Sequence, residues 1–95
     1  MNSKDFRDFL QQIERAITYR TVLSIKYHSA ATKAITKREV EPLGLYFTQN
    51  RWMMVAYCRL RKANREFRLD HISEITNTSD TFPPNQFELS DYFVK

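Results

Sequence analysis

The stretch of sequence that decides the fold is residues 51–71, which read RWMMVAYCRLRKANREFRLDH. Its first part, from Trp52 to Cys58, is apolar, which is typical of a buried strand. Five cations then follow within ten residues, namely Arg59, Arg61, Lys62, Arg65 and Arg68. Arginine carries a planar fork of donors that suits phosphate and carboxylate groups. The stretch therefore predicts a small β domain with a preformed anion-binding face, and it does not look like a catalytic centre.

The size and composition of the chain indicate a single folded domain spanning residues 1–95. Of its 95 residues, 42% are hydrophobic and 27% are charged, which is ordinary for a globular domain. The single glycine excludes a glycine-rich phosphate loop, and no apolar run approaches the roughly 20 residues of a membrane span. The single cysteine, Cys58, rules out an internal disulfide and fits a reducing compartment. We therefore expect a cytoplasmic protein without membrane association.

The positive charge is concentrated in the middle of the chain. The net charge is +4, but residues 20–71 carry eleven cations and four anions, whereas residues 72–95 carry one cation and four anions. A basic segment of this kind points to a polyanionic partner such as nucleic acid. A solvated basic surface explains the charge equally well.

Hydrophobic periodicity predicts one helix followed by short strands. Residues 4–19 place an apolar stripe at helical spacing, formed by Phe6, Phe9, Leu10, Ile13 and Ile17. Alternating apolar and polar residues then predict strands. These strands are expected at residues 22–28, 36–48, 51–59, 65–69 and 72–78.

The second predicted strand changes its inward parity between residues 41 and 44. Val40 would face inward with the even positions, whereas Leu43, Leu45 and Phe47 are odd. Proline cannot donate to a strand ladder, and glycine permits a sharp bend or a bulge, so Pro42 and Gly44 indicate one strand bent strongly enough to take part in both halves of a small barrel.

These elements predict a mainly β fold: a small five-stranded barrel of the Sm or SH3 kind over residues 22–79, preceded by one N-terminal α-helix. The second candidate is an open α+β sheet with the helix on one face. The tail, residues 81–95, is unusually apolar from Phe87 to Val94. It would form either a short C-terminal helix that docks on the domain or the start of a missing extension.

Three segments in register resemble the WYL domain, named for a Trp-Tyr-Leu triplet. They are residues 38–45 (REVEPLGL), 51–59 (RWMMVAYCR) and 65–72 (REFRLDHI). Two positions depart from the family pattern. The triplet here is Trp52-Met53-Met54, which lacks the tyrosine hydroxyl, and His71 stands where the family usually has arginine. Histidine is a weaker and titratable cation.

The resemblance implies an Sm-like barrel that acts as the ligand-sensing domain of a bacterial transcription regulator. Such regulators mostly carry a DNA-binding winged helix upstream, and several WYL domains bind single-stranded nucleic acid or nucleotide-like ligands on a basic face. Residues 1–20 hold one predicted helix, so the chain is either an excised sensory domain or a free-standing one.

The resemblance also implies which residues contact the ligand. Positions matching the basic face of the family are Arg38, Arg59, Arg65, Arg68 and His71. Three aromatic residues are candidates for stacking on a base, namely Trp52, Tyr57 and Tyr46. Trp52 shares the core-facing parity of its strand, so packing in the core is at least as good an explanation. Tyr57 has the opposite parity and is the better candidate for an exposed ring.

The leading hypothesis is therefore a regulatory domain that binds single-stranded nucleic acid or a nucleotide-like anion. The alternative is a protein-interaction or homodimerisation module, supported by the apolar tail and the helix stripe. An enzyme has little support, because no nucleophile with an adjacent base is evident and Cys58 has the parity of an inert core thiol. His28 and His71 with one cysteine give no metal-ligand spacing, and no cofactor is expected.

Overall fold

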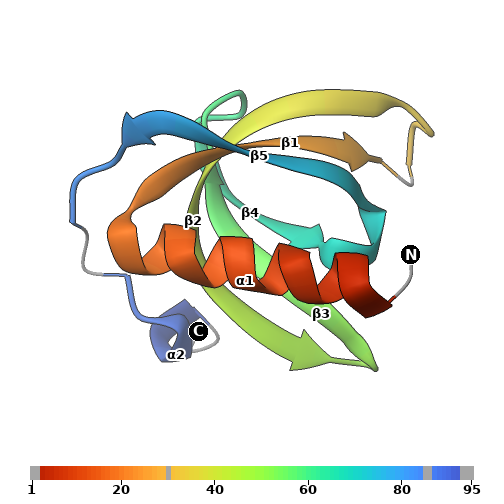
Figure 1. Ribbon diagram of the computed structural model, residues 1–95, viewed down its shortest axis with the longest axis horizontal. Helices are drawn as coiled ribbons and strands as arrows, with labels where there is room; N and C mark the ends of the chain where they lie inside the picture. The colour runs from red at the N-terminus through yellow and green to blue at the C-terminus, as the bar shows by residue number, and fades with distance from the viewer. Residues whose placement is uncertain (1–2, 30, 85–86, 93–95) are drawn as a thin grey trace.

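The chain folds into one long helix followed by five antiparallel strands, as described by a computed structural model for residues 3–29, 31–84 and 87–92 (Figure 1). Helix α1 spans Ser3–Tyr19. The strands are β1 (Thr21–His28), β2 (Ile35–Thr48), β3 (Arg51–Cys58), β4 (Ala63–Arg68) and β5 (Ile72–Thr81). The 3-10 turn η1 (Leu69–His71) joins β4 to β5, and a short helix α2 (Leu89–Tyr92) lies near the C-terminus. The predicted fold class is confirmed.

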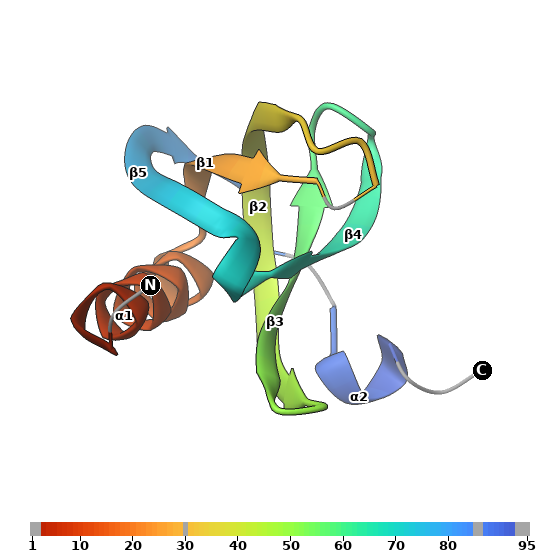
Figure 2. The same ribbon diagram turned by 90° about the vertical axis from the view of Figure 1, so that its right-hand side faces the viewer.

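The five strands form one sheet in the order β4-β3-β2-β1-β5, with every pair of neighbours antiparallel. The sheet curls strongly, so that β4 and β5, its two edge strands, both bend back across its inner face (Figure 2). In the same view the β2–β3 hairpin lies at one end of the sheet, and the β1–β2 loop and the β3–β4 turn lie at the other. This is the arrangement of a small SH3 or Sm barrel.

Strand β2 bends where its sequence predicts a bend, and the structure shows that the bend is a bulge. Pro42 is paired with Ala56 and Gly44 with Val55, so Leu43 is an extra residue without a partner in the ladder. The inward parity changes there from Val40 to Leu45, as expected. Leu43 itself was wrongly expected to face the core, because the bulged residue instead lines a crevice beside the C-terminal segment.

Gly44 has a different role from the predicted one. Its φ is not positive, so the bend does not need the conformational freedom of glycine. The cause is a close approach: an added Cβ would lie 3.3 Å from Leu89 Cδ1 and 3.6 Å from Phe87 Cε2. The C-terminal segment therefore packs on the outer face of β2. Phe93 and Val94, which also belong to the apolar tail, lie outside the described residues.

The core lies between the inner face of the sheet and helix α1. Ile13 and Ala16 of the helix are buried against residues from all five strands and η1. The strand and turn residues of this core are Leu23, Ile25, Val40, Met54, Ala56, Cys58, Phe67, Leu69 and Ile72. Phe6, Phe9, Leu10 and Ile17 pack around it, which is the stripe seen in the sequence. The helix thus covers one open side of the curled sheet (Figure 1).

The β2–β3 hairpin turns through two residues that both have positive φ, Gln49 at 49° and Asn50 at 63°. Two left-handed residues in a two-residue hairpin loop form a type I′ turn, which favours asparagine and glycine. The Cβ of glutamine makes the left-handed conformation sterically unfavourable, so the backbone at residue 49 is locally strained.

Replacing Gln49 by glycine should therefore stabilise the domain. We expect Gln49→Gly to raise the free energy of unfolding by up to about 1 kcal/mol, since a left-handed L-residue costs roughly 1–2 kcal/mol and part of this is offset by the entropy of glycine. Urea denaturation would measure the change. The control is Thr48→Gly in the adjacent strand position, which should destabilise the domain. A loss of stability in Gln49→Gly would contradict the assignment of the turn.

Candidate anion-binding site

Arg38 is the central residue of the candidate site. Strand β2 turns its side chain toward the inner face of the sheet, at the end away from the β2–β3 hairpin, and it is only 8% exposed. Its Nε donates a hydrogen bond to Thr36 Oγ1 at 3.1 Å, and its Nη1 lies 3.9 Å from Cys58 Sγ. The guanidinium carbon lies 5.9 Å from the centre of the Phe67 ring, which is within cation–π range.

No carboxylate among the described residues forms an ion pair with Arg38. A guanidinium is permanently charged, and burying it without a counter-charge is costly because hydroxyl, thiol and ring contacts replace only part of its hydration. A buried arginine in this condition is well suited to receive an anion from outside.

Arg65 approaches the same region from β4. It is paired with Ala56, a core residue, and therefore lies on the same face of its strand as Phe67 two residues later. Its side chain is exposed, and no ion pair with a described carboxylate holds it. Arg38 and Arg65 thus flank Phe67 on the inner face. We call these three residues the Arg38 site.

The other two predicted arginines lie on the outer face and already have partners. Arg59 Nε donates to Glu41 Oε2 at 3.1 Å, and its Nη1 is 3.8 Å from Asp80 Oδ2. Arg68 forms a two-pronged ion pair with Asp70, with distances of 3.0 and 2.7 Å. The four arginines that were expected to form one face are therefore divided between two faces.

The Arg68–Asp70 pair also shifts the titration of both groups. The hydrogen bonds from Arg68 hold the pKa of the Asp70 carboxyl below its usual range, and Asp70 in turn raises the pKa of Arg68. The carboxylate therefore stays ionised and keeps the fork of Arg68 occupied. An incoming anion would have to displace it.

The predicted aromatic residues are dispersed over the domain. Tyr57 is on the outer face, as its parity indicated, but it is half-buried and lines a cavity of about 190 Å³ with Phe87 of the C-terminal segment. Tyr46, also half-buried, is paired with Met53. Trp52 packs against the edge of the core at the hairpin end of β3. Trp52 and Cys58 are six positions apart, or roughly 20 Å of strand, so Trp52 does not join Arg38 in one site.

Tyr27 is a residue of this region that was not among the predicted site residues. Its ring packs edge-on against Phe67 with centroids 5.0 Å apart, and its hydroxyl accepts a hydrogen bond from the Arg68 backbone N–H at 3.2 Å. The ring of His71, a predicted site residue, lies 6.0 Å from that of Tyr27. The alternation of β1, which places Tyr27 on the same face as Ile25, was the signal that could have identified it.

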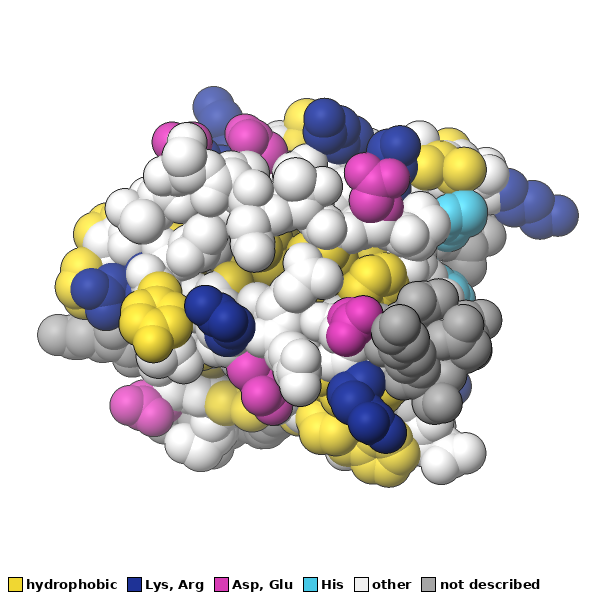
Figure 3. Space-filling model, viewed as in Figure 1, with side chains coloured by type: hydrophobic (Ala, Val, Ile, Leu, Met, Phe, Trp, Pro, Cys, Tyr) yellow, Lys and Arg dark blue, Asp and Glu magenta, His cyan; other side chains and the backbone are white. Residues whose placement is uncertain are grey.

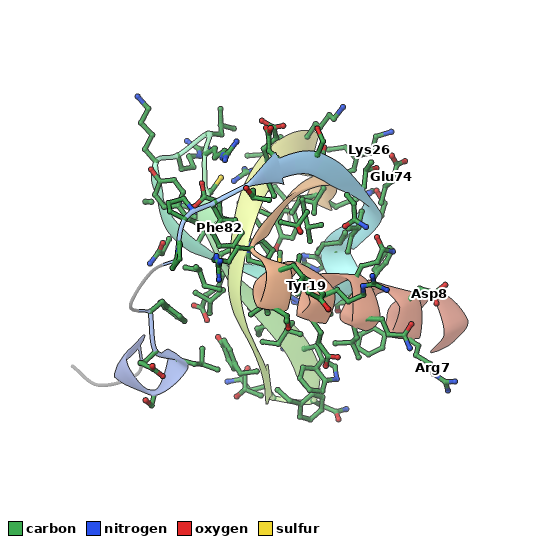
Figure 4. All side chains as sticks on the ribbon, turned by 60° about the vertical axis from the view of Figure 1, so that its left-hand side comes forward. Arg7, Asp8, Tyr19, Lys26, Glu74 and Phe82 are labelled. Atoms are coloured by element: carbon green, nitrogen blue, oxygen red, sulfur yellow. The ribbon has the colours of Figure 1, made fainter. Side chains whose placement is uncertain are left out.

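The face formed by α1 and β5 is a poor candidate for anion binding. Among its described side chains, cations and anions alternate and form no continuous basic patch (Figure 3). Lys26 and Glu74 lie side by side on the outer surface, with Nζ 3.4 Å from Oε2, whereas Arg7 and Asp8 point away from α1 (Figure 4). The unneutralised arginines of the Arg38 site lie instead on the inner face of the sheet.

A curled five-stranded sheet, a helix packed against it and a buried arginine at one end define a small β-barrel domain of the SH3 and Sm kind. The sequence profile of the WYL domain matches residues 8–77, and the chain belongs to the WYL domain family. The resemblance seen in the three motif segments is thereby confirmed.

Two similar proteins are considerably longer than this chain. The uncharacterized HTH-type transcriptional regulator YobV of Bacillus subtilis (strain 168) is 27% identical over 88 residues, which cover 93% of this chain and 28% of YobV. The structure of proteasome accessory factor B/C (PafBC) of Arthrobacter aurescens matches with a TM-score of 0.77 and 27% identity, over 85% of this chain and 13% of PafBC. The chain thus spans less than a third of either relative.

The described part of the chain offers neither a membrane-spanning helix nor a metal-binding cluster. Neither of its helices is long and apolar enough to cross a membrane. Its His, Cys, Asp and Glu side chains form no group of three or more that could hold a metal ion.

The buried charge of Arg38, which has no ion-pair partner among the described residues, should affect the stability of the domain. Replacing Arg38 by methionine removes the unpaired buried charge but keeps most of the packing, so we expect the free energy of unfolding to stay unchanged or to rise by about 1 kcal/mol. Urea denaturation would measure it.

The matched control is Arg59→Met on the outer face. It breaks the ion pair with Glu41 and should lower the free energy of unfolding by about 0.5–1 kcal/mol. A loss of more than about 1 kcal/mol in Arg38→Met would show instead that Arg38 serves the fold.

Proposed function

We propose that this domain is the ligand-sensing part of a transcription regulator, and that it binds single-stranded nucleic acid or a nucleotide-like anion at the Arg38 site. The observation that carries the proposal is the buried guanidinium of Arg38, which has no ion-pair partner among the described residues. Membership of the WYL family and the name of YobV as a transcriptional regulator support the regulatory part.

The chemistry of the Arg38 site favours a phosphate. Two arginines offer forks that match phosphate oxygens in pairs, and the exposed Arg65 gives a flexible second contact beside the fixed Arg38. Phosphate binding would supply the counter-charge that Arg38 lacks. Because the site includes the core residue Phe67, occupancy would be felt in the packing of β4.

The other predicted site residues lie outside the Arg38 site and have different roles in this proposal; they are Arg59, Arg68, Tyr57, Tyr46, Trp52 and His71. Arg59 and Arg68 contribute little, because Glu41, Asp80 and Asp70 already occupy their donors and offset their charge. His71 is connected to Phe67 through ring contacts with Tyr27. The signal would pass to a DNA-binding part of the regulator.

Salt dependence provides the main test of the proposal. If the two arginines of the Arg38 site neutralise about two phosphates, the affinity for a short oligo(dT) should fall with a log–log slope of roughly −1.4, or about sevenfold between about 50 and 200 mM salt. Fluorescence anisotropy of a labelled oligonucleotide would measure it. Arg65→Gln should reduce the slope by about 0.7, and Arg38→Gln should weaken binding to every base sequence, because phosphate contacts carry no base information.

Arg59→Gln is the matched control for these variants, since Glu41 and Asp80 already engage the side chain of Arg59. It should change the affinity little. Binding that is insensitive to salt, or absent even at low salt, would refute the proposal. An effect of Arg59→Gln as large as that of Arg38→Gln would move the site to the outer face.

The alternative function, an interaction or homodimerisation module, is less well supported. Its main argument was the apolar tail, but Phe87 and Leu89 pack on Gly44 of the same chain. Among the residues whose side chains the structure describes, the large apolar ones that remain exposed are Tyr19, Ile35, Phe47 and Leu60.

Sedimentation would separate the two functions. We expect the 95-residue chain to sediment as a monomer, and Leu60→Ser to sediment identically, because few exposed apolar residues fall short of a stable interface. The variant is expected to fold, since Leu60 lies in the exposed β3–β4 turn. A dimer that dissociates in Leu60→Ser would favour the interaction module.

A further inference from the structure

A cavity lies at the opposite end of β3 from Arg38, between the β2–β3 hairpin and the first turns of α1. Its volume is about 270 Å³. We call it the hairpin cavity, and its lining residues are Phe6, Phe47, Asn50, Arg51, Trp52 and Asp70. At the lower edge of the molecule, where the hairpin ends in Figure 1, apolar side chains reach the surface (Figure 3).

The walls of the hairpin cavity are aromatic and come from three separate elements. Phe6 belongs to α1, Phe47 to β2 and Trp52 to β3. The rings of Phe47 and Trp52 are 5.3 Å apart and inclined at 61°, in an edge-to-face contact. Phe47 is 54% exposed, although its pairing with Trp52 would place it on the core face. Clustered aromatic surface of this kind usually marks a binding site.

The rim of the hairpin cavity carries groups that both donate and accept hydrogen bonds. Arg51 supplies donors and is half-buried, with no ion pair to a described carboxylate. Asp70 supplies a carboxylate that Arg68 keeps in place and ionised, and Asn50 carries an amide with both functions. Flat apolar walls with a rim of mixed donors and acceptors match a planar ring whose edges carry the complementary groups.

We propose that the hairpin cavity binds a planar heteroaromatic ring of the nucleobase type, independently of the Arg38 site. The cavity is slightly smaller than the roughly 300–1,000 Å³ of pockets for drug-sized ligands, so it accommodates one ring system. Stacking of a base on an aromatic side chain contributes enough for weak, sequence-tolerant binding. The amide and carboxylate on the rim add a preference among bases.

The hairpin cavity and the Arg38 site are too far apart to bind the same nucleotide. About 20 Å of strand lie between Trp52 and Cys58, whereas the base and phosphate of one nucleotide are attached to the same sugar. One nucleotide therefore cannot occupy both sites. A nucleoside, which has no phosphate, is expected to bind only in the hairpin cavity, whereas a short strand can bind at both sites.

Trp52 is the single tryptophan of the chain and therefore reports directly on this cavity. Titration of the 95-residue protein with adenosine should quench the Trp52 fluorescence in a saturable manner and shift its indole N–H signal in NMR. Added salt should have little effect, because adenosine is uncharged. Arg38→Gln should retain this response, whereas Phe47→Ala should weaken the affinity for adenosine at least tenfold.

Phe47→Ala is expected to fold because the side chain is largely exposed and contributes little to the buried core. Phe47→Leu is the companion variant: it keeps apolar volume but lacks the ring, and it too should weaken binding. Tyr19→Ala removes an exposed aromatic ring at the far end of α1 and serves as the control. Quenching that is linear and equal to that of free tryptophan, or that is unchanged in Phe47→Ala, would overturn the inference.

Discussion

Strand β2 is the element on which the rest of this structure depends. Its first half is hydrogen-bonded to β1 and its second half to β3, and Val40 is paired with both neighbours, Leu23 and Cys58. A strand of 14 residues can serve two partners in a curled sheet only if it bends, and the bulge at Leu43 provides the bend while keeping apolar residues inward on both sides. The bend lets the sheet close around the core, and it also sends Arg38 and Phe47 to opposite ends of the barrel.

The two ends consequently differ in chemistry. The end nearest the β1–β2 loop offers a buried guanidinium over an aromatic ring, which suits an anion. The hairpin end offers aromatic walls with a polar rim, which suits a flat ring. The core and α1 fill the space between them, so a ligand that used both would have to pass around the sheet and not through it.

Charge pairing distinguishes the arginines more sharply than their number does. Arg59 and Arg68 satisfy their donors on neighbouring carboxylates at the surface, where such pairs contribute little to stability. Arg38 is buried with only a hydroxyl, a thiol and a ring as contacts, an arrangement that a stability requirement alone would not produce. A buried charge of this kind is costly unless a partner compensates it.

The sequence alone determined the strands, the helix stripe, the bend in β2 and the family, because these follow from local alternation, helical period and motif spacing. Parity correctly placed Trp52 with the core and Tyr57 on the outer face. Only the tertiary structure decided which arginines are neutralised, since Arg59 meets Asp80 from a distant strand, and that Phe6 joins Trp52. It also explained why residue 44 is glycine, because Leu89 packs closely against this position. A period of two reveals the face of a residue, but the groups that cover that face come from distant parts of the chain.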